Sequence, residues 1–319
     1  MKQQDFEKQH SALWQRFDEA VASKANSESL QSLPSDYQQI SHHLAMAKQR
    51  RYSGHLIQRL NTLVTEGHKH LYRDLPRAKA NFLYFLVAGF PQVVRKNASF
   101  VWFALALFYL PGLLFFFLCF LEPDLIYSLM SYAQVQEFEA MYEPSAETFG
   151  RERESDTDFA MFGFYIYNNI GISFQCFASG ILFCVGSIFF LVYNGIFIGA
   201  AAGHIAYVGY NETFFSFVVG HGSFELTAIA LSGAAGLKLG WALIAPGNLS
   251  RLFALKQAAK EAIVIIYGST VMLLIAAFVE AFWSSSSNLT PAIKYSVGGL
   301  GWFIVVYYLV VAGRARGAK

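Results

Sequence analysis

The chain has 319 residues, of which 55% are hydrophobic, 17% aromatic and only 14% charged. Soluble globular proteins carry roughly 25% charged residues, and several apolar runs here exceed the ~18 residues that indicate a membrane-spanning helix. This composition excludes a soluble enzyme, a disordered chain, a disulfide-rich secreted module and a basic nucleic-acid-binding protein. It predicts a multi-pass membrane protein that has the lipid bilayer, and no nucleic acid, as its partner.

The net charge of +2 conceals an uneven distribution along the chain. Residues 1–96 hold fourteen Lys and Arg against eight acidic residues, whereas residues 122–158 hold ten acidic residues against two Arg. Basic segments that flank short spans stay in the cytoplasm. We therefore expect the N-terminal region and the basic tail 314–319 to be cytoplasmic, and residues 122–158 to lie on the opposite side. No cleavable signal peptide is expected, because the first apolar span begins near residue 98.

Residues 1–76 have the pattern of a cytoplasmic helical bundle. Phe6, Leu13 and Phe17 fall at helical spacing, and two further amphipathic stripes follow after breaks at 26–34 and at Gly54. Pro34 is expected in the first turn of the second helix. Three such helices can form a small antiparallel bundle, which serves for docking or dimerisation more often than for catalysis.

Residues 77–97 predict an amphipathic helix at the membrane interface. Phe82, Phe85 and Phe90 form an apolar stripe with basic residues on both flanks, a pattern typical of helices that lie on the membrane surface. Packing of this segment on the preceding bundle fits the pattern equally well.

Six membrane spans are predicted, which makes the fold class an all-α polytopic bundle with an added soluble helical bundle. The first span covers 98–121, and an acidic external loop follows at 122–158. A five-span membrane core occupies 159–313, with spans near 159–182, 184–209, 213–245, 263–283 and 295–312. Three crossings between 159 and 246 carry the chain from the outside to a basic cytoplasmic loop at 246–260.

The external loop divides into two parts. Leu125, Leu129, Tyr132, Val135 and Phe138 give its first half an apolar stripe, so we expect a helix over 123–141 that caps the bundle. The second half, to residue 158, is expected to be a mobile acidic segment, because like charges at helical spacing repel one another.

Small residues recur at a spacing of four in the middle spans. Gly195, Gly199 and Gly203 form one row, and Gly236 and Gly240 continue a second row from Ser232. Such rows let helix backbones approach closely. Packing within the chain is the favoured interpretation, and packing between subunits of a homodimer or other homo-oligomer is the alternative.

Polar side chains at similar depth in three of these spans predict a shared midplane cluster. Its members are Asn168, Asn169, Asn194, His221 and Glu225. Ionisable groups deep in a bilayer are costly and mark functional sites. Lys238 and Glu280 lie nearer the ends of their spans and are expected to reach water.

His221 lies between two glycines, in a run from 213 to 245 that would be about 50 Å long as one helix. Because a ~30 Å hydrocarbon core does not need that length, we predict a broken or re-entrant helix near Gly220–Gly222, as at transporter sites. A continuous tilted helix, in which His221 and Glu225 bond to each other, remains the alternative.

Recognised catalytic motifs are absent from the sequence. Cys119, Cys176 and Cys184 lie in apolar spans without the spacing of metal ligands. The pairs His42/His43 and His68/His70 are expected on a solvated surface. No metal, cofactor or catalytic residue is therefore expected.

Residues 164–247 resemble the stage II sporulation protein M (SpoIIM-type) family of bacterial integral membrane proteins. Three segments carry the likeness: Tyr167-Asn168-Asn169-Ile170, Asn194-Gly195-Ile196-Phe197-Ile198-Gly199 and His221-Gly222-Ser223-Phe224-Glu225-Leu226. The resemblance implies a bacterial cytoplasmic (inner) membrane and a role in a multi-component membrane assembly. It also implies other membrane proteins and a MoxR-type ATPase as candidate partners. Founding members act in endospore engulfment but lack an extension like residues 1–96.

Three functional hypotheses follow. The first is a non-enzymatic subunit or scaffold of a membrane complex, whose cytoplasmic bundle recruits partners. The second is a transporter or channel for a small solute or ion that uses the midplane cluster. The third is an intramembrane enzyme with Glu225 as base, which would need a water-filled cavity at that depth.

Overall fold

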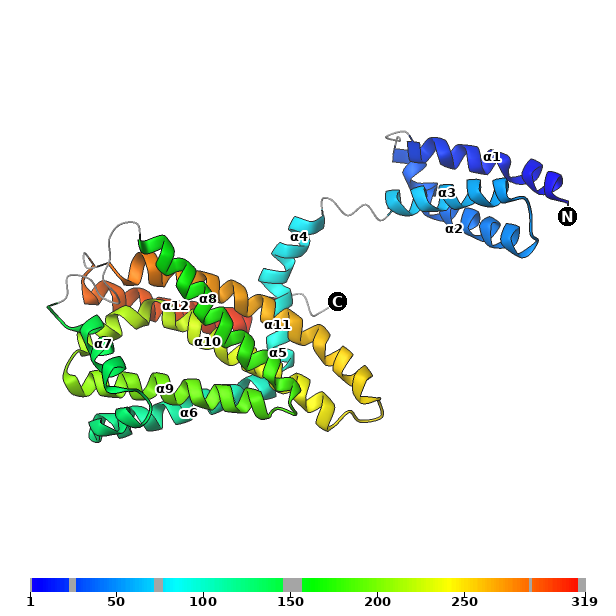
Figure 1. The fold of residues 1–319 in the computed structure, drawn as a ribbon. Coiled ribbons are helices and arrows are strands. Elements are labelled where there is room, and N and C mark those ends of the chain that lie inside the picture. Colours follow the sequence, from blue (N-terminus) through cyan, green and yellow to red (C-terminus); the bar gives the residue numbers. More distant parts are fainter. Residues whose placement is uncertain (1, 23–26, 72–76, 146–156, 287–288, 315–319) are drawn as a thin grey trace. The chain divides into compact units, whose positions relative to one another are not determined.

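The computed structural model describes residues 2–22, 27–71, 77–145, 157–286 and 289–314, and the elements formed by these residues are all helical (Figure 1). The chain divides into two compact units, residues 1–81 and 82–319. The all-α prediction is confirmed. Residues 146–156 of the expected mobile segment and 315–319 of the basic tail lie outside the described residues.

The first unit is a bundle of α1 (Gln3–Ala22), α2 (Ser27–Gln49) and α3 (Gly54–Leu71). Its core draws on all three helices: Phe6, Trp14, Phe17, Leu33, Ile40, Leu44, Ala47, Leu56, Leu60 and Leu63. Pro34 lies inside α2 rather than in its first turn, because that helix already begins at Ser27. The apolar stripes thus become the interior of a separate small domain.

The next elements are α4 (Arg77–Tyr84), the π-helical turn η1 (Phe85–Gly89) and α5 (Phe90–Lys96). The boundary between the two units falls within α4, after residue 81. The buried ring of Phe90 packs directly on Gly268, where an added Cβ atom would collide with it. Arg95 donates to the carbonyl oxygens of Leu309 and Ala312, both at 2.7 Å. The end of the predicted interfacial segment is therefore integrated with the membrane helices.

Five helices of the described chain are long and apolar enough to cross a membrane. They are α6 (Ala98–Leu121), α9 (Val185–Val208), α10 (Asn211–Ile244), α11 (Arg251–Val279) with the π-helical turn η4 (Glu280–Ser284), and α12 (Pro291–Val311). The helix α8 (Thr157–Ala178) occupies the predicted second span and packs on α9, α10 and α11. Asn168, Asn169 and Gln175 make it less apolar than the five, so its crossing stays a prediction.

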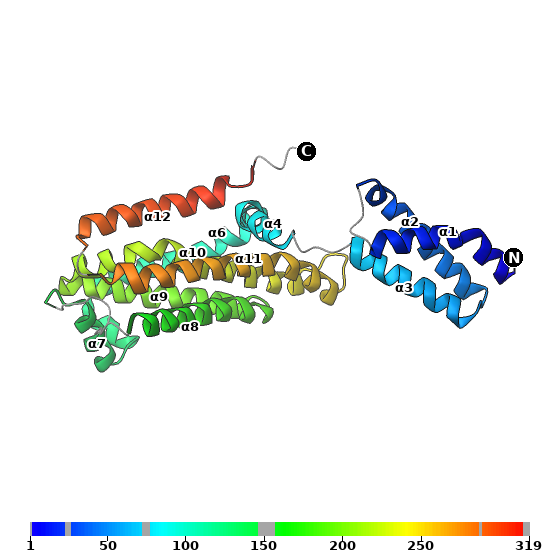
Figure 2. The same cartoon turned by 90° about the horizontal axis from the view of Figure 1, so that it is seen from above.

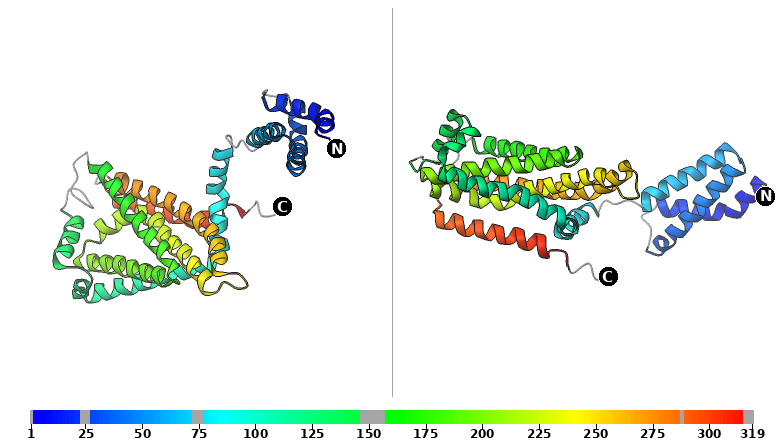
Figure 3. Two further views of the ribbon diagram at one scale, coloured as in Figure 1. Left: turned by 45° about the vertical axis from the view of Figure 1, so that its right-hand side comes forward. Right: turned by 90° about the horizontal axis from the view of Figure 1, so that it is seen from below.

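The helix α10 lies at the centre of this unit. It packs against α6, α8, α9, α11 and α12, and α8 and α12 lie on opposite sides of it (Figures 2 and 3). Its long series of Gly, Ala and Ser residues allows this close contact on several faces. The polar residues of α10 are consequently placed in the interior of the bundle.

The predicted break at Gly220–Gly222 is wrong, because α10 is one continuous helix of 34 residues. Gly220 instead faces η4, where a Cβ atom would come within 2.6 Å of the Trp283 ring and 2.9 Å of Ser284 Oγ. Glycine is needed there for the close approach of two helices, which the sequence alone does not distinguish from a helix break.

The rows of small residues pack within the chain. A Cβ atom at Gly195, Gly199 or Gly203 would collide with the carbonyl oxygens of Phe108, Gly112 and Phe116, respectively, on α6. A Cβ atom at Gly236 or Gly240 would collide with the corner between α8 and α9, where the 3₁₀ turn η3 (Ser179–Ile181) lies. These glycines fix the distance between neighbouring helices.

The single helix predicted over 123–141 is wrong in its continuity. The structure has a 3₁₀ helix, η2 (Pro123–Ser128), followed by α7 (Tyr132–Tyr142). Ser131 and Gln134 form a capping box that starts α7 afresh. Ile126, Met130 and Val135 nevertheless bury their side chains against Cys119 and residues of α9, so both short helices cover this end of α6 and α9.

Candidate functional site

Three ionisable side chains meet inside the membrane unit: His221 and Glu225 on α10, and Glu280 at the start of η4. One ligand-type atom from each, a ring nitrogen or a carboxylate oxygen, lies within 4.8 Å of the other two. His221 is 5% exposed and Glu280 8% exposed. We call these three residues the His–Glu–Glu cluster.

Helix geometry explains how α10 contributes two members. Residues four apart lie on one face of an α-helix, and the continuity of α10 through Gly222 preserves this relation between His221 and Glu225. His221 and Glu225 are thus brought together by a continuous helix, which was the alternative to the predicted break.

Glu280 was expected to reach water near the end of its span, and this expectation is wrong. The α-helix α11 passes into the π-helical turn η4 at Glu280, and both Glu280 and Ser284 are buried. Single π turns inside helices are frequent at functional sites. A carboxylate in an otherwise apolar span was the sequence signal, but its inward direction depends on the π turn.

Hydrogen bonds support the cluster from neighbouring residues. The Nδ1 atom of His221 lies 3.2 Å from Ser284 Oγ, which fixes the plane of the imidazole ring. The Lys294 ammonium, on α12 and 1% exposed, donates to the carbonyl oxygen of Ser284 at 2.7 Å. Within the described residues, Glu225 Oε2 is buried and has no hydrogen-bonding partner.

A hollow of about 490 Å³ with a mixed polar and apolar lining shares Lys294 with the hydrogen bonds that support the cluster. It is formed by the start of α10 and the start of α12, and its lining includes Glu212, Thr213, Ser216 and Lys294. Ser216 precedes His221 by five residues, or about 7.5 Å along a helix. Lys294 connects the wall of the hollow to Ser284, and through it to His221.

The three asparagines of the predicted cluster make their hydrogen bonds within their own helices. Asn168 donates to Asn169 at 3.0 Å, within α8. Asn194 donates to the carbonyl oxygen of Phe190, within its own helix, at 2.7 Å. No hydrogen bond given by the described residues connects these amides to the cluster. Their grouping with His221 and Glu225 stays a prediction.

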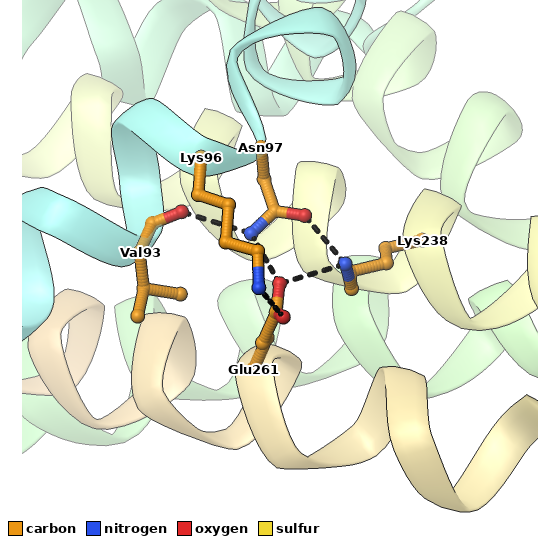
Figure 4. A network of polar contacts seen from close by, with 5 residues as sticks. All are labelled: Val93, Lys96, Asn97, Lys238 and Glu261. Carbon is orange, nitrogen blue, oxygen red and sulfur yellow. Dashed lines mark hydrogen bonds and ion pairs between the residues drawn. The ribbon is translucent and has the colours of Figure 1, made fainter.

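A second, partly buried polar group surrounds Glu261 on α11 (Figure 4). Its carboxylate accepts from Lys96 at 2.7 Å, Lys238 at 2.9 Å and Asn97 at 2.9 Å. Lys238 also donates to Asn97 Oδ1 at 2.6 Å. Lys238, which was expected to reach water, keeps 17% of its side chain exposed. It is also held in a network that joins α10 and α11 to the junction of α5 and α6.

Buried histidines occur at two further places. His204 on α9 lies 2.7 Å from Glu139 on α7 and thereby fastens α7 to the membrane unit. His43, which was expected on a solvated surface, is 6% exposed and lies 3.2 Å from the Trp14 indole nitrogen. Desolvation by burial lowers the pKa of His43 from 6.5 to about 4.

The helices and the buried polar groups define a polytopic α-helical membrane protein. The family model of stage II sporulation protein M matches residues 98–285, and the chain belongs to this family. Residues 4–73 match the model of a domain of unknown function (DUF8413). No curated protein and no solved structure matches the chain. The whole His–Glu–Glu cluster falls within the part matched to stage II sporulation protein M.

Proposed function

We propose that the protein is a non-enzymatic subunit of a membrane complex, in which the N-terminal bundle recruits a partner. The observation that carries this proposal is the independence of residues 1–81, which have a hydrophobic core of their own. A separate domain model matches the same region. A domain that folds on its own core is free to present its polar face to another protein.

The test is gentle purification of the full chain and of a variant that lacks residues 1–71, each followed by mass measurement. The full chain should co-purify with other proteins or with a second copy, and the deletion should remove those that bind through the bundle. A MoxR-type ATPase and other membrane proteins are the partners to look for. A strictly monomeric particle that captures nothing through the bundle would contradict the proposal.

The proposed setting is the bacterial cytoplasmic membrane, with both chain termini in the cytoplasm. The charge distribution supports this orientation. Because the three native cysteines are buried, single cysteines at exposed positions can report it. A membrane-impermeant maleimide applied to spheroplasts should label Glu122→Cys, and should label Gln38→Cys only after lysis. The reverse pattern would overturn the orientation.

Transport of a small solute or ion is the second candidate function. It is favoured by the His–Glu–Glu cluster and by the hollow that Lys294 lines. Glu225→Gln should then abolish flux in reconstituted vesicles while expression and the size-exclusion profile stay unchanged. His204→Gln, which alters a buried histidine elsewhere, is the matched control. Flux that persists in Glu225→Gln would remove this candidate.

A further inference from the structure

We propose that the His–Glu–Glu cluster of His221, Glu225 and Glu280 binds one divalent transition-metal ion, of which Zn²⁺ is the representative. The site goes beyond the proposed subunit function and does not depend on it. One nitrogen and two carboxylate oxygens lie within 4.8 Å of one another. Zinc bonds of about 2.0–2.2 Å need such atoms no more than about 4.4 Å apart, so small side-chain shifts are enough to bring all three onto a single ion.

The charges of the cluster favour a cation. Two carboxylates in a membrane interior are costly unless they are paired or neutralised. Lys294 contributes one positive charge nearby through its bond to the Ser284 carbonyl, so two ionised carboxylates still leave a net negative charge. The buried, unbonded Oε2 atom of Glu225 is a donor with its lone pairs available.

The surroundings of His221 match those of a metal-bound histidine. Such a ligand usually binds the metal with one ring nitrogen and uses the other in a hydrogen bond that orients the ring. Ser284 Oγ, 3.2 Å from Nδ1, supplies that hydrogen bond. Since Nδ1 is engaged, Nε2 is the nitrogen that carries the metal bond.

The donor set narrows the class of ion. Mixed imidazole and carboxylate ligands suit Zn²⁺, Mn²⁺, Fe²⁺ and Co²⁺, whereas Cu⁺ prefers sulfur. The cysteines of the chain pack in other parts of the bundle, Cys119 against α9 and Cys176 and Cys184 in a different core cluster. Three protein ligands leave a fourth position for water. We expect water and ion to enter from the side of the hollow that Ser216 and Lys294 line.

Metal binding to the full chain in detergent is the direct test. The protein is purified without a histidine tag, stripped with chelator and titrated with Co²⁺, whose visible absorption reports the ligand geometry. One Co²⁺ per chain should bind and be displaced by Zn²⁺, with no thiolate charge-transfer band. Absence of saturable binding at one ion per chain, or a thiolate band, would overturn the proposal.

Variants then locate the ion. Glu225→Gln and Glu280→Gln should each raise the dissociation constant by about 10- to 100-fold or more, and Ser284→Ala by about tenfold, as expected for a supporting hydrogen bond. Glu139→Gln and His204→Gln, which alter the buried pair between α7 and α9, should leave it unchanged. Equal affinity in the cluster variants and the controls would exclude this site.

Loss of folding in a cluster variant must not be mistaken for loss of a ligand. X-ray absorption spectroscopy of the wild-type chain with Zn²⁺ gives an answer that needs no variant. One imidazole with oxygen donors near 2.0 Å is the expected first shell. A shell containing sulfur, or six oxygens without imidazole, contradicts the assignment.

Discussion

The Lys238 ammonium on α10 lies 2.9 Å from the Glu261 carboxylate on α11, and both side chains are largely withdrawn from solvent, at 17% and 24% exposure. The backbone of the membrane unit brings this pair together from positions 23 residues apart, across the loop between the two helices. Each charge is therefore stabilised by the fold that holds it, and removing Glu261 leaves Lys238 without a countercharge.

Glu261→Gln should destabilise the membrane unit. Lys238 would keep its bond to Asn97 but lose its countercharge, at an expected cost of about 1–3 kcal/mol, reduced from that of a fully buried pair by the remaining exposure. Thermal unfolding in detergent measures this as a lower melting temperature. Lys96→Gln is the matched control, because the Lys96 side chain is 70% exposed and its loss should cost no more than about 0.5 kcal/mol. Equal melting temperatures for the two variants would contradict the structural role of the Lys238–Glu261 pair.

The N-terminal bundle should lose stability in mild acid. Burial depresses the pKa of His43 below its unfolded value of 6.5, to about 4, and the nearby His10 and His42 add to this effect. The folded state thus binds fewer protons than the unfolded state between these values, so stability present above pH 6.5 is lost as the pH falls toward 4. The loss is at most about 1.4 kcal/mol per pH unit.

Thermal melts of residues 1–81, followed by circular dichroism from pH 7.5 to 4.5, check this. His43→Gln, which can still accept from Trp14, should flatten the dependence. Exposed His42 offers the control, and His42→Gln should leave most of the slope. A stability that is constant between pH 7 and 5 in the unaltered bundle would show that His43 is not held neutral.

The sequence predicts features that arise within one chain segment better than contacts between segments. Apolar periodicity was sufficient for the N-terminal bundle, five of the six predicted spans and the His221–Glu225 pair, because each depends on spacing along one chain segment. Glu280 and Ser284 were missed as partners, since their direction depends on the π turn η4. The grouping of the three asparagines with the His221–Glu225 pair stays a prediction, because similar depth does not reveal which face of a helix meets which neighbour. Gly220 was interpreted as a helix break, because glycine occurs both at breaks and where two helices pack closely, as it does here.

Substitution of Gly199 should disturb the contact between α6 and α9. A Cβ atom there would collide with the backbone of Gly112, which cannot move aside as a flexible side chain would. Gly199→Ala should therefore cost about 1–3 kcal/mol, as overpacking does. Gly171→Ala on α8 is the control, because nothing lies within 4 Å of its added methyl group. Melting temperatures in one detergent compare the two, and a Gly199→Ala variant as stable as the control would show that the α6–α9 distance is adjustable.

Arg95 should hold the C-terminal end of α12 in place. The last carbonyl groups of a helix have no partner within it, and Arg95 satisfies those of Leu309 and Ala312 with two hydrogen bonds of 2.7 Å. Gln92 adds a bond to the carbonyl of Gly313 at 2.8 Å.

Arg95→Met keeps the apolar stem of the side chain but removes both donors and the positive charge that favours a helix C-terminus. Hydrogen exchange in the last turn of α12, residues 308–312, should then become faster, whereas exchange in α6 and α9 should not change. Lys96→Met removes the neighbouring charge without touching α12 and should leave that turn protected. Unchanged exchange at 308–312 in Arg95→Met would show that packing alone fixes this helix end.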